Sequence, residues 1–200
     1  LKMTRDEAYK LMIEMLQSKN LQKHGLAVEA IMRSLCKYLK EHLALQGDAW
    51  EPAEFNEQEW AIVGLLHDAD YELVEKDPQR HTLVTEEKLR SLGVSERIIN
   101  GIKAHHDGIK ISRDNLMEKS VYATDELSGL ITAVALVRPD KKLSSVTVES
   151  VMKKFPQKSF AAGANRDQIL ACERELNIPL EEFVGIALKA MQGIAQELGL

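Results

Sequence analysis

The chain has 200 residues, of which 28% are charged and 44% hydrophobic, and its formal net charge is −5. A chain of this length can bury one sizeable core, so we expect a single domain over residues 1–200. The acidic balance gives no broad basic field, which argues against long nucleic acid as a partner. The sequence shows neither a charged and then apolar leader nor an apolar run of about 18 residues. We therefore expect a cytoplasmic protein without a membrane partner.

Helical periodicity dominates the sequence, and strand-like alternation is nearly absent. Thr4 and Glu7 form a capping-box pattern that predicts the start of a first helix. Asn20 is predicted to cap a second helix, which carries His24 on its apolar face and ends at Gly47. These patterns favour an all-α fold.

A third helix is predicted to begin after Asn56, with Glu59 completing a capping box, and to end at the adjacent pair His67 and Asp68. Its residues are almost all apolar, which is typical of a helix in the centre of the core. The polar segment 70–80 is predicted to be a loop over the site.

The next two predicted helices bring three more histidines. His81 is predicted to open a short helix that Gly93 closes. Ser95 is predicted to cap the following helix, which leads to His105 and His106.

A long helix is predicted after the polar stretch 107–115, ending before Pro139. It carries Asp125 inside an apolar stripe, where an unpaired ionisable group would be costly. The small residues Ser128 and Gly129 beside it predict a close approach by another helix.

The last part of the chain, about residues 140–200, contains no histidine and is predicted to form a helical cap. Short helices are predicted at residues 148–154, after Asn165 and after Pro179. As an alternative, residues 156–167 could form an active-site loop with Lys158 or Ser159 near the substrate.

Five of the six histidines fall into an ordered series with two aspartates. The members are His24, His67, Asp68, His81, His105, His106 and Asp125. Imidazole and carboxylate together suit Fe, Mn, Co, Ni or Zn better than Ca or Mg. The donors exceed what one ion takes from protein while keeping an open position. We therefore expect two ions, about 3.5 to 4 Å apart and bridged by one carboxylate.

The motifs around these residues are "GLLHDADYE", "RHTLVTEEKLRSLGVSERIINGIKAHHD" and "VYATDELSGLI", preceded by His24. In this order they resemble the HD superfamily of metal-dependent phosphohydrolases over about residues 20–137. The later segment "VRPDKKLSSVTVESVMKKFPQKSFAAG" is similar to the tail of small uncharacterised bacterial and archaeal HD proteins. The resemblance implies an HD-domain helical bundle with additional C-terminal helices.

The resemblance also implies roles for the ordered residues. The implied ligands of a first metal are His24, His67, Asp68 and Asp125. Asp68 would also bridge to a second metal, which His81 and His105 would complete. His106 would be either a further ligand there or a group that faces the substrate.

One position departs from the family pattern. Many HD hydrolases have a lysine three residues after the aspartate of the doublet, and this chain has Tyr71 there. The Gly-Tyr-Pro signature of the cyclic-dinucleotide phosphodiesterase branch is also missing. Two other cations, Lys23 and Arg80, adjoin expected ligands and are our candidates for contact with phosphate.

The expected activity is hydrolysis of a small phosphate ester, such as a nucleotide-like molecule, by a metal-activated water. Asp68, His106, Lys23 and Arg80 are the expected catalytic residues. Two other classes fit the same ligands: a di-iron oxygenase of the HD type and a non-catalytic module that senses a nucleotide. Nothing in the sequence specifies an oligomeric state.

Overall fold

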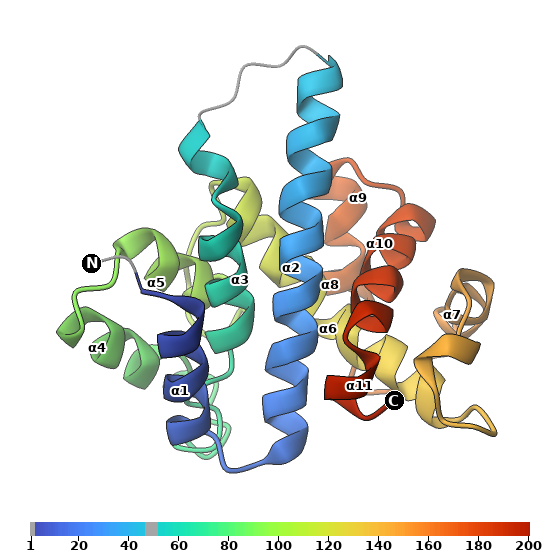
Figure 1. Cartoon of the computed structure of the whole chain (residues 1–200), viewed down its shortest axis with the longest axis horizontal. Helices are drawn as coiled ribbons and strands as arrows, with labels where there is room; N and C mark the ends of the chain where they lie inside the picture. Colours follow the sequence, from blue (N-terminus) through green and yellow to red (C-terminus); the bar gives the residue numbers. More distant parts are fainter. Residues whose placement is uncertain (1–2, 47–51) are drawn as a thin grey trace.

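The computed structural model describes residues 3–46 and 52–200, and every regular element in these ranges is helical (Figure 1). The α-helices of the first half are α1 (Arg5–Met15), α2 (Lys19–Gln46), α3 (Glu57–Leu66), α4 (Leu83–Ser91) and α5 (Glu96–Lys103), with a 3₁₀ turn at Pro52–Phe55 before α3. The expected all-α fold is confirmed. No helix within the described ranges is long and apolar enough to cross a membrane.

The second half begins with the long helix α6. Its helices are α6 (Leu116–Leu136), α7 (Val148–Lys154), α8 (Arg166–Ile169), α9 (Ala171–Leu176), α10 (Leu180–Gly193) and α11 (Ala195–Leu198), with a 3₁₀ turn at Leu143–Ser145. The helices predicted near residues 148–154, after Asn165 and after Pro179 are confirmed as α7, α8 and α10.

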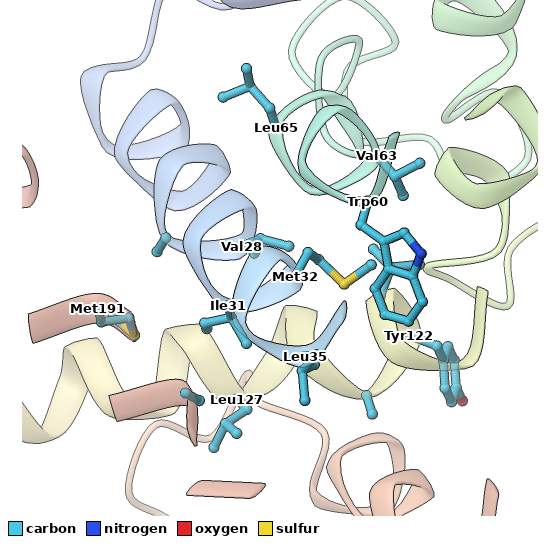
Figure 2. Close-up of a cluster of buried hydrophobic side chains, with 14 of the residues drawn as sticks. Val28, Ile31, Met32, Leu35, Trp60, Val63, Leu65, Tyr122, Leu127 and Met191 are labelled. Carbon is cyan, nitrogen blue, oxygen red and sulfur yellow. The ribbon is translucent and has the colours of Figure 1, made fainter. Parts of the chain in front are cut away.

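Helix α2 runs through the middle of the molecule and packs against α3, α6 and α10 (Figure 1). Figure 1 shows α1, α3, α4 and α5 on one side of it and the C-terminal helices on the other. The core along α2 is apolar, as Figure 2 shows. Its buried side chains include Val28, Ile31, Met32, Leu35, Trp60, Val63, Leu127 and Met191.

Two glycines allow α2 and α3 to pack closely. A Cβ atom at Gly25 would lie 2.9 Å from the carbonyl oxygen of Leu65. A Cβ atom at Gly64 would lie 2.8 Å from the carbonyl oxygen of Val28, also a backbone atom. Because backbone cannot move aside as a flexible side chain can, only glycine fits at these positions.

The sequence predicted that another helix approaches closely at Ser128 and Gly129, and this prediction is right for Ser128 but wrong for Gly129. Ser128 is buried and contacts α2 through His24. Gly129 is exposed, and a Cβ atom there would meet no atom within 4 Å. The small residue at position 129 therefore leaves open space and does not admit a helix.

Most of the predicted helix starts are confirmed. Thr4 and Glu7 form the capping box of α1, and the side chain of Asn56 accepts hydrogen bonds at the start of α3. The predicted capping box of α3 is only half formed, because the carboxylate of Glu59 accepts a hydrogen bond from Arg97 and does not bond back to Asn56. Gly47, predicted to end α2, lies outside the described residues.

Two predicted helix starts are wrong. Helix α2 begins at Lys19, so Asn20 lies inside its first turn, and the carboxylate of Glu72 accepts the N–H groups just before the helix. His81 does not open α4, which begins at Leu83 after Thr82 in a left-handed conformation.

The C-terminal helices contact the segment after α5. The side-chain amide of Gln168 in α8 donates a 3.0 Å hydrogen bond to the carbonyl oxygen of His105.

Candidate metal centre

The structure brings the ordered histidines and aspartates together from five separate segments. His24 comes from α2 and Asp125 from α6, while His67 and Asp68 lie in the turn after α3. His81 lies in the loop before α4, and the pair His105 and His106 follows α5. Two groups result, His24, His67 and Asp68 in one and His81, His105 and His106 in the other. In each group the candidate ligand atoms lie within 4.8 Å of one another.

The first group includes Asp125 as well. Nε2 of His24 lies 3.0 Å from Nε2 of His67 and 2.9 Å from Oδ1 of Asp125. Oδ2 of Asp68 lies 3.6 Å from both imidazole nitrogens. Four side chains thus direct nitrogen and oxygen atoms at one small volume.

The second group meets the other oxygen of Asp68. Oδ1 of Asp68 lies 3.1 Å from Nε2 of His81 and 3.5 Å from Nε2 of His105. These two imidazole nitrogens lie 3.0 Å apart. The carboxylate of Asp68 therefore stands between the two groups and turns one oxygen toward each.

Hydrogen bonds at Nδ1 fix which nitrogen of each ring faces the centre. Nδ1 of His67 donates to the carbonyl oxygen of Gly64 at 2.8 Å. Nδ1 of His105 donates to the carbonyl oxygen of Ile102 at 2.6 Å. Because both acceptors are carbonyl oxygens, Nδ1 carries the hydrogen, and in the neutral ring Nε2 presents its lone pair.

His81 and His24 follow the same rule. Nδ1 of His81 donates to Oδ1 of Asp70 at 2.7 Å. Nδ1 of His24 lies 3.0 Å from the hydroxyl of Ser128, which donates its own hydrogen to the carbonyl oxygen of Asp125. Ser128 therefore accepts from His24, and all four Nε2 atoms are available as ligands.

This arrangement fits a cation in each group. Two neutral imidazoles with lone pairs 3.0 Å apart repel each other unless a positive charge lies between them. The nearby carboxylates supply negative charge, because contacts with the histidines overcome burial and lower the pKa of Asp68 and Asp125. Imidazole nitrogen with carboxylate oxygen is a donor set for divalent transition metals.

The same electrostatics acts on the histidines. Burial by itself would lower the pKa of His67, but Asp68 and Asp125 outweigh burial and raise that pKa to about 9. Burial is likewise outweighed at His81, where Asp68 and Asp70 raise the pKa to about 9. Both groups therefore favour a bound positive charge.

His106 is oriented differently from its four neighbours. Its Nδ1 accepts a 3.0 Å hydrogen bond from the backbone N–H of Gly108, so in the neutral ring Nε2 carries the hydrogen. Burial and the nearby His105 and His81 lower the pKa of His106 to about 4, which keeps the ring neutral. Its buried Nε2 has no hydrogen-bond partner among the described residues.

Asp70 is a site residue that the sequence reasoning missed. Its side chain is fully buried and accepts hydrogen bonds from His81 and from the backbone N–H groups of Thr82 and Thr85. These contacts overcome the effect of burial and lower the pKa of Asp70. The available signal was an aspartate two residues after the doublet, in a segment predicted to be a loop.

The centre opens into a cavity of about 510 Å³. Its wall includes Leu21, His24, Asp68, Tyr71, Lys76, His81, His105, His106, Asp125, Glu126 and Gly163. Among the described residues of this wall, Lys76 is the one with a cationic side chain. The backbone of Lys76 has a left-handed conformation. Tyr71 stands edge-on to His81, with ring centroids 5.2 Å apart.

The two cations expected to contact phosphate lie elsewhere. Lys23 lines a neighbouring cavity, and Arg80 is exposed and is not part of the wall. Their roles stay predictions. Of the loop at residues 156–167, Gly163 reaches the wall, whereas Lys158 and Ser159 do not.

Comparison with known protein families matches residues 21–135 to the HD domain. No curated protein and no solved structure matches the chain. The match spans more than half of the chain and contains the whole histidine and aspartate series. HD domains bind divalent metals and are generally metal-dependent phosphohydrolases. The chain belongs to the HD domain family.

Proposed function

We propose that this protein is a phosphohydrolase that holds two divalent transition-metal ions and cleaves a small phosphate ester. The observation that carries the proposal is the position of Asp68, whose two oxygens face two separate histidine groups. A carboxylate shared between two cation sites is the arrangement used by two-metal phosphoesterases. The cavity beside these groups and the family membership support the same function.

Each proposed metal has its own set of side chains. His24, His67, Asp68 and Asp125 would hold the first ion. His81, His105 and Asp68 would hold the second. Fe, Mn, Co, Ni and Zn all suit these donors.

The reaction is a hydrolysis in which a water oxygen bonds to phosphorus, the bond from phosphorus to the ester oxygen breaks, and the alcohol leaves with a proton. Divalent ions held there would supply an activated water and stabilise charge on the phosphoryl oxygens. His106 can donate a hydrogen bond from Nε2 to a phosphoryl oxygen, because that atom lacks another partner. Lys76 in the same wall can pair with the phosphoryl charge.

The size and charge of the site favour a small substrate. The cavity volume lies within the range of cavities that bind drug-sized molecules, roughly 300 to 1,000 Å³. A net charge of −5 does not favour long nucleic acid. A nucleotide or another small phosphate ester meets both conditions.

The test is phosphate release from a panel of nucleotides and sugar phosphates by protein loaded with Mn, Fe, Co or Ni. We expect release that a chelator stops and that Asp68→Asn abolishes. Asp6→Asn, an exposed position in α1, is the matched control and should keep full activity. Consumption of oxygen without phosphate release would indicate an oxygenase, and nucleotide binding without turnover would indicate a sensor.

A further inference from the structure

A second cavity, of about 400 Å³, adjoins the metal centre. His24 and Gly129 belong to the walls of both cavities. The remaining residues of the second wall come from α2, α6 and the segment around α11, which packs against α2. They are Asn20, Lys23, Ala27, Thr132, Leu136, Leu198, Gly199 and Leu200.

The second cavity continues two helix faces that begin at the metal centre. On α2, Asn20 and Ala27 lie four residues before and three residues after His24. On α6, Gly129 and Thr132 lie four and seven residues after Asp125. Residues at these spacings share one face of a helix. The two cavities therefore lie along the same faces of α2 and α6.

Gly129 lies where the walls of the two cavities meet. A Cβ atom at this position would meet no atom within 4 Å, so nothing in the packing requires a glycine. Glycine is less favourable than alanine inside a helix by about 1 kcal/mol. Packing therefore gives no reason for a glycine at the place where the two cavities meet.

The chemistry of the second wall differs from that of the first. The first wall carries the carboxylates of Asp68, Asp125 and Glu126. None of the described side chains in the second wall is acidic, and Lys23 supplies a positive charge there. Ala27, Leu136 and Leu198 add apolar surface. This mixture suits an aliphatic group that ends in an anionic substituent.

We propose that the second cavity binds the organic group of the substrate, so that the phosphate ester lies along α2 and α6 and passes over Gly129. The phosphoryl group sits at the metal centre, and an aliphatic group with an anionic end extends toward Lys23. This inference rests on the proposed phosphohydrolase function and narrows its substrate class.

The test uses n-alkylphosphonates, whose carbon–phosphorus bond is not hydrolysed, and calorimetric titration of the manganese-loaded protein. From methyl- to butylphosphonate we expect affinity to rise about three- to fourfold for each methylene group. Gly129→Leu should abolish this increase, because the new side chain would fill the space where the substrate chain passes. Gly193→Leu is the matched control, since Gly193 also faces open space on a helix but lines neither cavity.

A second arm tests the anionic end. We expect 4-phosphonobutyrate to bind about two- to fivefold more tightly than butylphosphonate, and Lys23→Gln to remove this preference. Thr132→Leu narrows the second cavity from an independent position and should reproduce the effect of Gly129→Leu.

The outcomes separate this inference from the proposed function. If methylphosphonate binds but longer chains gain nothing, or if Gly129→Leu and Thr132→Leu keep the full gain, the second cavity is not a substrate site and the phosphohydrolase proposal stands. If no phosphonate binds to the loaded protein, both proposals are wrong.

Discussion

The buried carboxylate of Asp70 accepts a 2.7 Å hydrogen bond from Nδ1 of His81, and this contact turns Nε2 of His81 toward Asp68. Asp70 is itself held by the backbone N–H groups of Thr82 and Thr85. A carboxylate that orients a metal-binding imidazole raises the basicity of the ligand nitrogen as well as fixing its direction.

Asp70→Asn is predicted to weaken the second metal site. The amide has the same shape as the carboxylate, but its NH₂ group is a donor. It would face one of the backbone N–H groups whose hydrogen bonds Asp70 now accepts. We expect the affinity for the second metal equivalent to fall about 10- to 100-fold, with the first equivalent unchanged. Asp77→Asn in the same loop is the control. The side chain of Asp77 accepts its hydrogen bond from the backbone N–H of Gln79, which is outside the metal centre. Equal loss of both equivalents would contradict the assignment of His81 to one site.

The adjacent histidines are predicted to have different functions. His105→Ala should remove one metal equivalent, because Nε2 of His105 faces Asp68. His106→Ala should keep both equivalents and lower turnover by about 10²-fold, the size expected for loss of a positioned proton donor. Elemental analysis of each variant, together with its rate of phosphate release, checks the division. Loss of a metal equivalent in His106→Ala would make His106 a ligand.

Gly64→Ala is predicted to destabilise the fold and the first metal site together. The added methyl group would lie 2.8 Å from backbone oxygen in α2 and would push apart the helices that carry His24 and lead to His67. We expect the free energy of unfolding to fall by about 1–3 kcal/mol in urea denaturation. Gly185→Ala in α10 has room for its methyl group and should be neutral or stabilising. Equal stability of the two variants would show that α2 and α3 tolerate separation.

Lys76→Met is predicted to lower kcat/KM for phosphate esters at least tenfold, by removing the cation from the cavity wall. Arg80→Met, two residues beyond Pro78 and exposed, is the comparison. Steady-state kinetics on both variants decides between the cation found in the wall and the cation expected from the sequence. A larger loss in Arg80→Met would favour the sequence-based assignment.

The sequence predicted the helical class because helix formation depends on local patterns, and it predicted the meeting of the histidines and aspartates through their ordered series and its resemblance to the HD superfamily. Apolar periodicity shows which face of a helix is buried, and His24 and Asp125 lie on such faces. Capping residues such as Thr4 and Asn56 act within one turn, so their prediction needs no tertiary information.

The sequence could not predict what depends on contacts between distant segments. At the start of α2, Glu72 accepts the N–H groups of Gln17 and Ser18 across 55 and 54 residues of sequence, beside the local cap that Ser18 provides. The open space at Gly129 and the close packing at Gly64 have the same sequence signal, a glycine within a helix, and only the neighbouring helix distinguishes them. Lys76 lines the cavity from a loop in which Glu75 and Lys76 have left-handed backbone conformations, which neither residue type indicates.

The central claim is that two metal ions, shared through Asp68, are needed for phosphate ester hydrolysis. The most direct measurement is the rate of p-nitrophenyl phosphate and bis(p-nitrophenyl) phosphate hydrolysis while metal-free protein is titrated with manganese. The account predicts that the rate rises to a plateau at two equivalents per chain and stays at zero in Asp68→Asn. A plateau at one equivalent would contradict the dinuclear centre, and no hydrolysis of either ester at any loading would contradict the phosphohydrolase.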